Sequence, residues 1–342
     1  MMTASADSIQ LWLTKVFPAL FPFMAGCSIL LRIGAAERIG HFLRPLTRGF
    51  FGLDGIAAFP FFIGILSGYP VGARITAQLY EEKQISSEDA LHILIFSNNP
   101  GPLFLIGTVG AGFFGRPFYG YLLLLSSFLS AVFTGILWRF YRKNTPETYP
   151  LISHRRPVLP LNEILSSSVS DSMNTNLLIG GYLIFFNTFC EGLHQAGLFS
   201  FLSEHLFFLP VSGNTLQGIC SGLLEMTTGT FLLSQSEDAL LIRLTLTAFL
   251  ISFGGLSILG QTFGILSAVP ISKKDYFKGQ CIKALFSSLF FLLFFHFFEQ
   301  KAQKAVPAYF LFTETAFTLS FLWFLPSLFC LGVLCYTRLY RK

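Results

Sequence analysis

Two short polar segments interrupt the apolar first half of the chain, and their residue types could bind a small solute. The first is Ser67-Gly68-Tyr69-Pro70, which is followed by Arg74. Pro70 cannot donate a backbone hydrogen bond and disfavours helix at the residue before it, so one helix is expected to end here and another to begin. The start of such a half-helix carries free N–H groups and a partial positive charge, which attract anions.

The second polar segment, Ser97-Asn98-Asn99-Pro100-Gly101-Pro102, predicts another break, because two prolines and a glycine follow two asparagines. Its serine and asparagine side chains supply hydrogen-bond donors and acceptors without a full charge. Helix packing through small residues is the competing interpretation for most polar positions of this chain. Here a solute site is favoured over packing, because close packing does not require two prolines.

The second half of the chain offers a corresponding set of small and polar residues. Glu225 is the only acidic residue deep within its apolar stretch, and Arg74 is the matching cation of the first half. An ionisable residue at membrane depth is a functional hypothesis by default, although structural pairing or a position near the interface explains both charges equally well. The candidate substrate-binding residues are Ser67, Gly68, Tyr69, Pro70, Arg74, Ser97, Asn98, Asn99, Gly101, Ser221, Glu225, Thr228, Ser252, Gly254, Ser257 and Gln261.

Catalytic and metal-binding patterns are not recognisable in the sequence. The six histidines are scattered, with no HExxH motif and no cysteine at ligand spacing. Intramembrane serine proteolysis would need a facing pair such as Ser67 and His296, and no spacing supports that pair. We therefore expect no enzymatic activity, no catalytic or metal-binding residues and no cofactor. A coupling Na⁺ held by carbonyls and hydroxyls would leave no trace in the sequence.

The composition places these segments in a membrane. Of the 342 residues, 53% are hydrophobic and only 12% are charged, and the mean hydropathy is +0.62. A soluble domain carries about 25% charged residues, so a soluble enzyme, a disordered chain and a secreted disulfide scaffold are excluded. The chain is predicted to be an all-α polytopic membrane protein whose first partner is the lipid bilayer. The net charge of +5 does not indicate nucleic-acid binding, because the cations gather in short segments.

Five apolar runs are long enough to cross the bilayer, and two further apolar regions, 50–115 and 206–270, are interrupted by Gly, Pro, Ser and Asn. The five runs are 11–31, 118–138, 176–198, 279–298 and 318–337. Interrupted segments at membrane depth are tolerated only where the backbone is buried in protein or lines a cavity. The two interrupted regions are therefore where we expect discontinuous or re-entrant helices and the functional site.

Charge predicts the orientation of the spans. Sixteen of the 23 Lys and Arg residues lie in 32–48, 139–163, 272–283 and the C-terminal 338–342, whereas the alternate segments are poor in them. The positive-inside rule then places the N-terminus outside and the C-terminus in the cytoplasm of a multi-pass protein of the cell membrane. No basic residue precedes the first apolar run, so no cleaved signal peptide is expected.

The two halves resemble each other at an offset of about 150 residues. Ile65-Leu66-Ser67-Gly68 matches Ile219-Cys220-Ser221-Gly222, residues 101–107 match 254–260, and Ser-Glu-Asp-Ala occurs at 87–90 and 236–239. Because the basic segment 32–48 corresponds to 191–205, which has no Lys or Arg, the two copies are predicted to be inverted. Inverted repeats with broken helices are typical of secondary transporters. The predicted divisions are a first repeat 11–142, a basic linker 143–163, a second repeat 164–298, and a loop with a C-terminal helix 299–342.

With SGYPVGAR, the acidic turn after it and FSNNPGPLFLIGTVG in view, the chain resembles the sporulation integral membrane protein YlbJ (SpoVV) family. The entry segment from Leu11 to Phe23 is also similar. The resemblance covers nearly the whole chain and is most specific in the first half. It implies a nucleoside-recognition gate domain shared with concentrative nucleoside transporters, and movement of dipicolinic acid across the outer forespore membrane. One departure from the family pattern is that the resemblance leads us to expect a further hydrophobic segment before Trp12, whereas this sequence begins almost at the motif.

The leading hypothesis is a transporter of a small organic anion, most concretely dipicolinate, held by half-helix N-termini and by Asn and Ser donors, with Tyr69 available for stacking. A nucleoside-type carrier is the second hypothesis and predicts competition by nucleosides. A non-transporting scaffold of spore envelope assembly is the third, and it predicts that changes in 97–101 are tolerated while changes in 139–163 are not. Candidate protein partners are a second copy of the chain or other sporulation membrane proteins.

Overall fold

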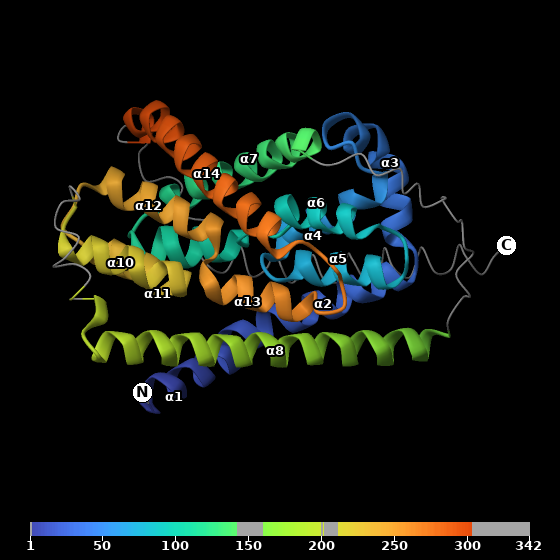
Figure 1. The fold of residues 1–342 in the computed structure, drawn as a ribbon, viewed down its shortest axis with the longest axis horizontal. Coiled ribbons are helices and arrows are strands. Elements are labelled where there is room, and N and C mark those ends of the chain that lie inside the picture. Colours follow the sequence, from blue (N-terminus) through green and yellow to red (C-terminus); the bar gives the residue numbers. More distant parts are fainter. Residues whose placement is uncertain (1, 142–159, 200, 202–210, 303–342) are drawn as a thin grey trace.

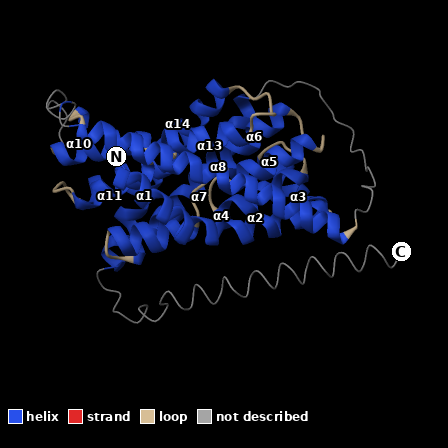
Figure 2. Ribbon diagram, turned by 90° about the horizontal axis from the view of Figure 1, so that it is seen from below, coloured by secondary structure: helices blue, strands red, loops and turns tan. Residues whose placement is uncertain are grey.

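The computed structural model describes residues 2–141, 160–199, 201 and 211–302. These residues form helices joined by short turns, and no strand occurs among them (Figure 2). The predicted all-α class is confirmed. The predicted C-terminal span 318–337 and most of the basic linker lie outside the described residues.

Within the described residues, four helices are long and apolar enough to cross a membrane. They are α7 (Pro117–Tyr141), α8 (Leu161–Gln195), the pair α12 (Leu240–Phe253) and α13 (Gly255–Ile265) taken as one span, and α14 (Lys273–Ala302). In Figure 1, α8 lies along one edge of the molecule, and α7 and α14 lie along the opposite edge. The predicted runs 118–138 and 279–298 fall inside α7 and α14. Helix α8 begins earlier than the predicted run 176–198, at a residue that had been assigned to the linker.

The predicted span 11–31 lies within one continuous helical segment. It consists of α1 (Met2–Leu11), the π-helical η1 (Trp12–Val16) and α2 (Phe17–Arg32). The indole N–H of Trp12 donates to the carbonyl of Asn176 in α8 at 3.2 Å. The following basic segment is not a loop, because α3 (Ala35–Phe50) makes it a helix. The chain turns by 95° between 38–50 and 55–67, and η2 (Gly55–Ala57) begins the second of these stretches. This is the geometry of a broken span or a re-entrant loop.

Both predicted breaks of the first half are present. Helix α4 (Ala58–Ser67) ends before Gly68, and α5 (Val71–Glu81) begins after Pro70. A short turn leads to α6 (Ser87–Ser97), which ends before Asn98, and the π-helical η3 (Leu103–Phe113) begins after Pro102. The first half therefore contains two interrupted helix pairs that are joined by a turn.

The second half repeats this order of elements. Helix α10 (Gly213–Leu224) ends before Glu225, α11 (Met226–Gln235) follows, and α12 is separated from α13 by Gly254, whose φ is +86°. The repeated Ser-Glu-Asp-Ala lies at the turn of each half, where it begins α6 in one copy and joins α11 to α12 in the other. The order agrees with two repeats, and their inversion across a membrane stays a prediction.

The repeated aspartate has a different partner in each copy. In the first half Asp89 and Ser86 form a capping box at the start of α6. In the second half the Asp238 carboxylate accepts from the backbone N–H of Ser212 at 2.9 Å and from its hydroxyl at 2.8 Å. Since Ser212 caps α10, this aspartate connects the turn to the start of the first broken helix of its half.

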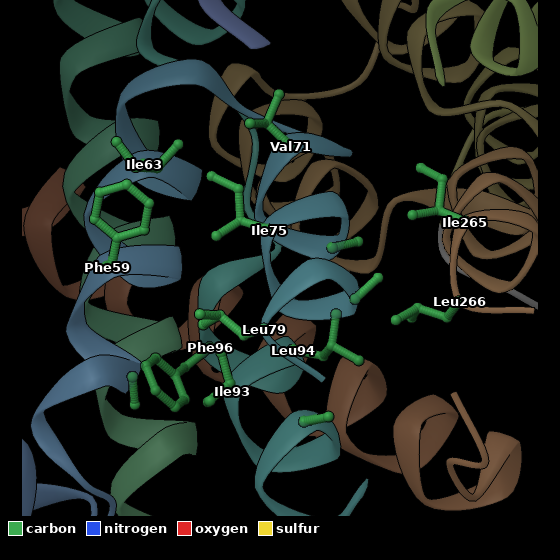
Figure 3. Close-up of a cluster of buried hydrophobic side chains, with 14 of the residues drawn as sticks. Phe59, Ile63, Val71, Ile75, Leu79, Ile93, Leu94, Phe96, Ile265 and Leu266 are labelled. Atoms are coloured by element: carbon green, nitrogen blue, oxygen red, sulfur yellow. The ribbon is translucent and has the colours of Figure 1, made fainter. Parts of the chain in front are cut away.

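A buried apolar cluster joins the first half to the end of α13. Phe59 and Ile63 from α4, Val71, Ile75 and Leu79 from α5, and Ile93, Leu94 and Phe96 from α6 lie together, with Ile265 and Leu266 approaching from the second half (Figure 3). In Figure 1, α10–α12 lie toward one end of the molecule and α4–α6 lie toward the other. The broken helices thus meet where the two halves face each other.

Candidate substrate site at the helix breaks

The two breaks of the first half touch through their backbones. Gly68 has φ +85°, and a Cβ built on it would lie 2.6 Å from the backbone nitrogen of Gly101. A Cβ on Gly72 would lie 2.5 Å from the carbonyl oxygen of Ser97. Only glycine fits such contacts without displacing backbone. The predicted residues of 67–70 and 97–101 are therefore brought into one place, as expected from two facing breaks.

The breaks of the second half cross in the same manner. Gly255 has φ +71°, and a Cβ there would lie 2.9 Å from the carbonyl oxygen of Gly222. Gly229 of α11 faces the backbone of the same Gly222. In each half, then, the first interrupted helix pair packs against the second through the backbone of glycines. In the second half this packing places Ser221 and Gly254 near the same junction.

Asn98 connects the first junction to the second half. Its side-chain N–H groups donate to the Thr262 hydroxyl in α13 at 3.0 Å and to the Tyr276 hydroxyl in α14 at 2.9 Å. The Tyr69 hydroxyl makes a second link, because it donates to the carbonyl of Ile251 in α12. Both links lie beside predicted breaks, so the contact between the halves runs through the candidate site.

Lys283 of α14 is a residue of this site that the sequence analysis missed. Its ammonium donates to the carbonyl oxygen of Asn98 at 2.7 Å and to the side-chain oxygen of Asn99 at 3.3 Å. The side chain is completely buried, and it forms no ion pair with any residue in the described ranges. Lys283 was counted among the basic residues of 272–283, but its side chain is buried between helices and does not lie in an exposed basic segment. The available signal was its sequence context: apolar residues surround it, five positions beyond Lys278.

Three buried polar atoms at the breaks have no hydrogen-bond partner in the part of the chain that the structure describes. They are the hydroxyls of Ser97 and Ser252 and the side-chain oxygen of Asn98. Ser97 is the last residue of α6 and Ser252 is the next to last of α12, so the two hydroxyls precede corresponding breaks. Buried polar groups in native proteins normally have partners, which makes these three atoms candidates for contact with a ligand.

Glu225 acts as the cap of a half-helix. Its carboxylate accepts from the backbone N–H of Thr227 at 3.1 Å, from that of Thr228 at 2.8 Å, and from the Thr228 hydroxyl at 3.0 Å. The start of α11 attracts negative charge, and this carboxylate already supplies it. The start of α11 is therefore not an open anion site. This differs from the expectation that half-helix N-termini bind the anion.

The side chain of Arg74 pairs with α8. Its guanidinium lies 3.5 Å from the carboxylate of Asp171 in α8, which also pairs with Arg32 at 2.7 Å. Of the two interpretations left open for Arg74 and Glu225, the geometry favours structural pairing for Arg74 and helix capping for Glu225. Asp171 precedes the predicted apolar run 176–198, which is why the sequence analysis did not consider it.

The remaining candidates lie on the second half. Ser257 and Gln261 are buried in α13 and hydrogen-bond to each other at 3.3 Å. Ser221 and Thr228 line a cavity of about 370 Å³ between α1, α8 and the α10–α11 pair. Other polar side chains of that cavity are Asp7, Ser8, Asn187, Glu191 and His194. These four candidates are thus divided between the α13 interior and a separate cavity.

Comparison with known proteins identifies a family match and one curated relative. Residues 13–117 match the Gate family, described as nucleoside recognition, and this stretch contains both breaks of the first half. The chain is 31% identical over 313 residues to the sporulation integral membrane protein YlbJ of Bacillus subtilis (strain 168). The alignment covers 85% of this chain and 76% of that protein. No solved structure shows significant similarity to the chain.

Proposed function

Since the chain belongs to the YlbJ family of sporulation integral membrane proteins, we propose that it is a transporter of a small organic anion, with dipicolinate as its substrate. It is an integral membrane protein with several membrane-length helices. By extension of the proposal, its C-terminus lies in the cytoplasm and the protein acts in the outer forespore membrane. The proposal includes no enzymatic step and no cofactor.

The observation that carries the proposal is the set of unpartnered polar atoms at the breaks. A buried hydroxyl without a partner costs about 1–3 kcal/mol, and in a membrane no bulk water compensates for it. Ser97 and Ser252 have such hydroxyls near the ends of α6 and α12, the helices that precede a break in each half. A bound ligand with hydrogen-bond acceptors would give these two hydroxyls the partners that they lack.

An anion fits the donors that are available. Both serine hydroxyls can donate to carboxylate oxygens, and the Lys283 ammonium adds positive charge beside Asn98. Dipicolinate is a planar pyridine ring with two carboxylates, so it presents acceptors at both ends. Its identity as the substrate comes from the family resemblance, and the geometry supports only the class of a small anion.

A nucleoside carrier is the second candidate, and two observations favour it. The Gate match is described as nucleoside recognition, and the free side-chain oxygen of Asn98 is an acceptor that suits a hydroxyl or amine donor better than a carboxylate. A nucleoside offers such donors. The two candidates differ in which free atom at the breaks the substrate contacts.

Reconstitution into liposomes tests the proposal. We expect uptake of labelled dipicolinate by the native chain. Each of Ser97→Ala and Ser252→Ala should weaken binding by about tenfold or more, because a hydrogen bond to a charged group contributes about 1.5–3 kcal/mol. The matched control is Ser167→Ala, which removes a partly exposed hydroxyl bonded only within α8. Competition by uridine or adenosine would favour the nucleoside carrier. Folded protein with neither binding nor flux would support a scaffold instead.

A further inference from the structure

We infer that the ammonium of Lys283 occupies the place at which a carrier of this design would bind Na⁺, so that Na⁺ neither binds at the first-half break nor drives transport. The statement about binding concerns the protein alone. The statement about transport rests on the proposed function.

The position of the ammonium is that of a cation at the end of a half-helix. Asn98 is the residue at which α6 ends, and the carbonyls of a last helical turn carry partial negative charge. Ends of this kind and the unwound carbonyls beside them coordinate Na⁺ in carriers with broken helices. Here Lys283 donates to a carbonyl oxygen of Asn98 and to the side-chain oxygen of Asn99, two successive residues of the unwound segment.

One face of α14 is built to deliver this ammonium. Tyr276 and Lys283 are seven residues apart, which places them on the same face of a helix, and both contact Asn98. Between them, Gly279 lies against Ile95, where a Cβ would be 2.7 Å from a side-chain carbon of that isoleucine. The glycine lets α14 approach α6 closely enough for the lysine to reach the break. A lysine that served only to anchor α14 at the membrane surface would point outward.

The preceding lysine of α14, Lys278, differs from Lys283 in exposure and in its partner. The side chain of Lys278 is 58% exposed and lies 3.4 Å from Asp275. Lys283 is completely buried and has no carboxylate partner among the residues whose side chains are described. Its charge is therefore balanced by the two oxygens at the break. A metal cation at the same oxygens would be repelled at short range in a medium of low dielectric constant, so the ammonium and Na⁺ exclude each other.

Binding of ²²Na⁺ to the purified protein tests this directly. We expect no saturable binding to the native chain. Lys283→Ala removes the ammonium and leaves both oxygens, and we expect it to bind ²²Na⁺ with an apparent affinity at least about tenfold higher than the native chain. NaCl in place of choline chloride should then raise the melting temperature of this variant only. Lys278→Ala is the matched control and should behave as the native chain does. Lys283→Met keeps most of the side-chain volume and should bind no Na⁺.

Two results would overturn the inference: saturable ²²Na⁺ binding to the native protein that Lys278→Ala does not alter, or a folded Lys283→Ala variant that is indifferent to Na⁺. If that variant does not fold, the native measurement still decides. In liposomes, dipicolinate flux by the native chain should be equal in Na⁺ and in choline. A flux that requires Na⁺ contradicts the inference while supporting transport, and an absence of flux contradicts the proposed function without affecting the binding result.

Discussion

The guanidinium of Arg74 lies 3.5 Å from the carboxylate of Asp171. This ion pair joins α5, which follows the first break, to the long helix α8. Asp171 also holds Arg32 at 2.7 Å, so one carboxylate compensates two cations. All three side chains are between one-fifth and one-third exposed. This triad ties α2, α5 and α8 together.

Asp171→Asn should destabilise the protein more than Arg74→Gln does. The aspartate change leaves two guanidinium groups without a charged partner, whereas the arginine change leaves the Arg32 pair intact. We expect a loss of about 1–2 kcal/mol in unfolding free energy for Asp171→Asn and a smaller one for Arg74→Gln. Thermal unfolding in detergent measures both, and Arg48→Gln, at a side chain that is 58% exposed, serves as the control. Equal effects of the two triad variants would contradict the shared carboxylate.

Gly68→Ala should disrupt the first junction. The backbone of Gly68 has φ +85° and ψ −178°, a region that only glycine adopts readily, and a Cβ there would meet the nitrogen of Gly101 at 2.6 Å. Strain and overpacking together predict a loss of about 2–5 kcal/mol. Gly26→Ala is the matched control, because a Cβ at that position of α2 meets no atom within 4 Å. A Gly68→Ala protein with the native melting temperature would contradict the close backbone contact between Gly68 and Gly101.

Glu225→Ala should lower stability without changing substrate affinity. The substitution removes the cap of α11, for which a loss of about 1–2 kcal/mol is expected. Glu225→Gln keeps one side-chain oxygen and should lose less. The melting temperature and the dissociation constant of dipicolinate, measured on the same samples, separate capping from binding. A variant with native stability but weakened binding would return Glu225 to the substrate site.

Asp238 gives a prediction for pH dependence. Hydrogen bonds from Thr215 and Ser212 lower the pKa of the Asp238 carboxyl in the folded protein. A lowered folded-state pKa stabilises the protein above the unfolded pKa of about 3.9, and this contribution disappears as the pH falls through the folded value. Asp238→Asn should therefore reduce the melting temperature at pH near 7, and the difference from the native chain should shrink on acidification. A difference that is independent of pH would exclude this carboxylate as its source.

Local features of the sequence were sufficient to predict the breaks. Pro70 and the Pro100–Pro102 segment cannot continue a helix, and Gly254 adopts a φ that other residues avoid, so these breaks follow from the chain itself. The apolar runs likewise predicted α7 and α14. The residues that contact a break could not be predicted in the same way. Proline and glycine decide where a helix ends, but they do not decide which distant residue packs there.

The partners across the fold could not be predicted in this way. Asn98 and Lys283 meet only because Gly279 lets α14 pack against α6, and a single lysine at the end of a basic segment looks the same whether it faces solvent or the interior. Arg74 and Asp171 lie in different halves, with nothing in either local sequence to indicate the pair. Charge counting treated Lys283 as a marker of topology, and the structure makes it part of the site.

The glycine contacts at the first junction have a consequence for movement. Within the first half, α4, α5 and α6 approach one another backbone to backbone at Gly68, Gly72 and Gly101, so these helices can slide past each other only by breaking close contacts. Between the halves, by contrast, Asn98 and Tyr69 reach across with side chains alone. Side-chain hydrogen bonds exchange by rotamer changes, which backbone contacts cannot do. An alternation between inward-open and outward-open states would therefore carry α4–α6 as one rigid body over α12 and α13, with the hinge outside the junction.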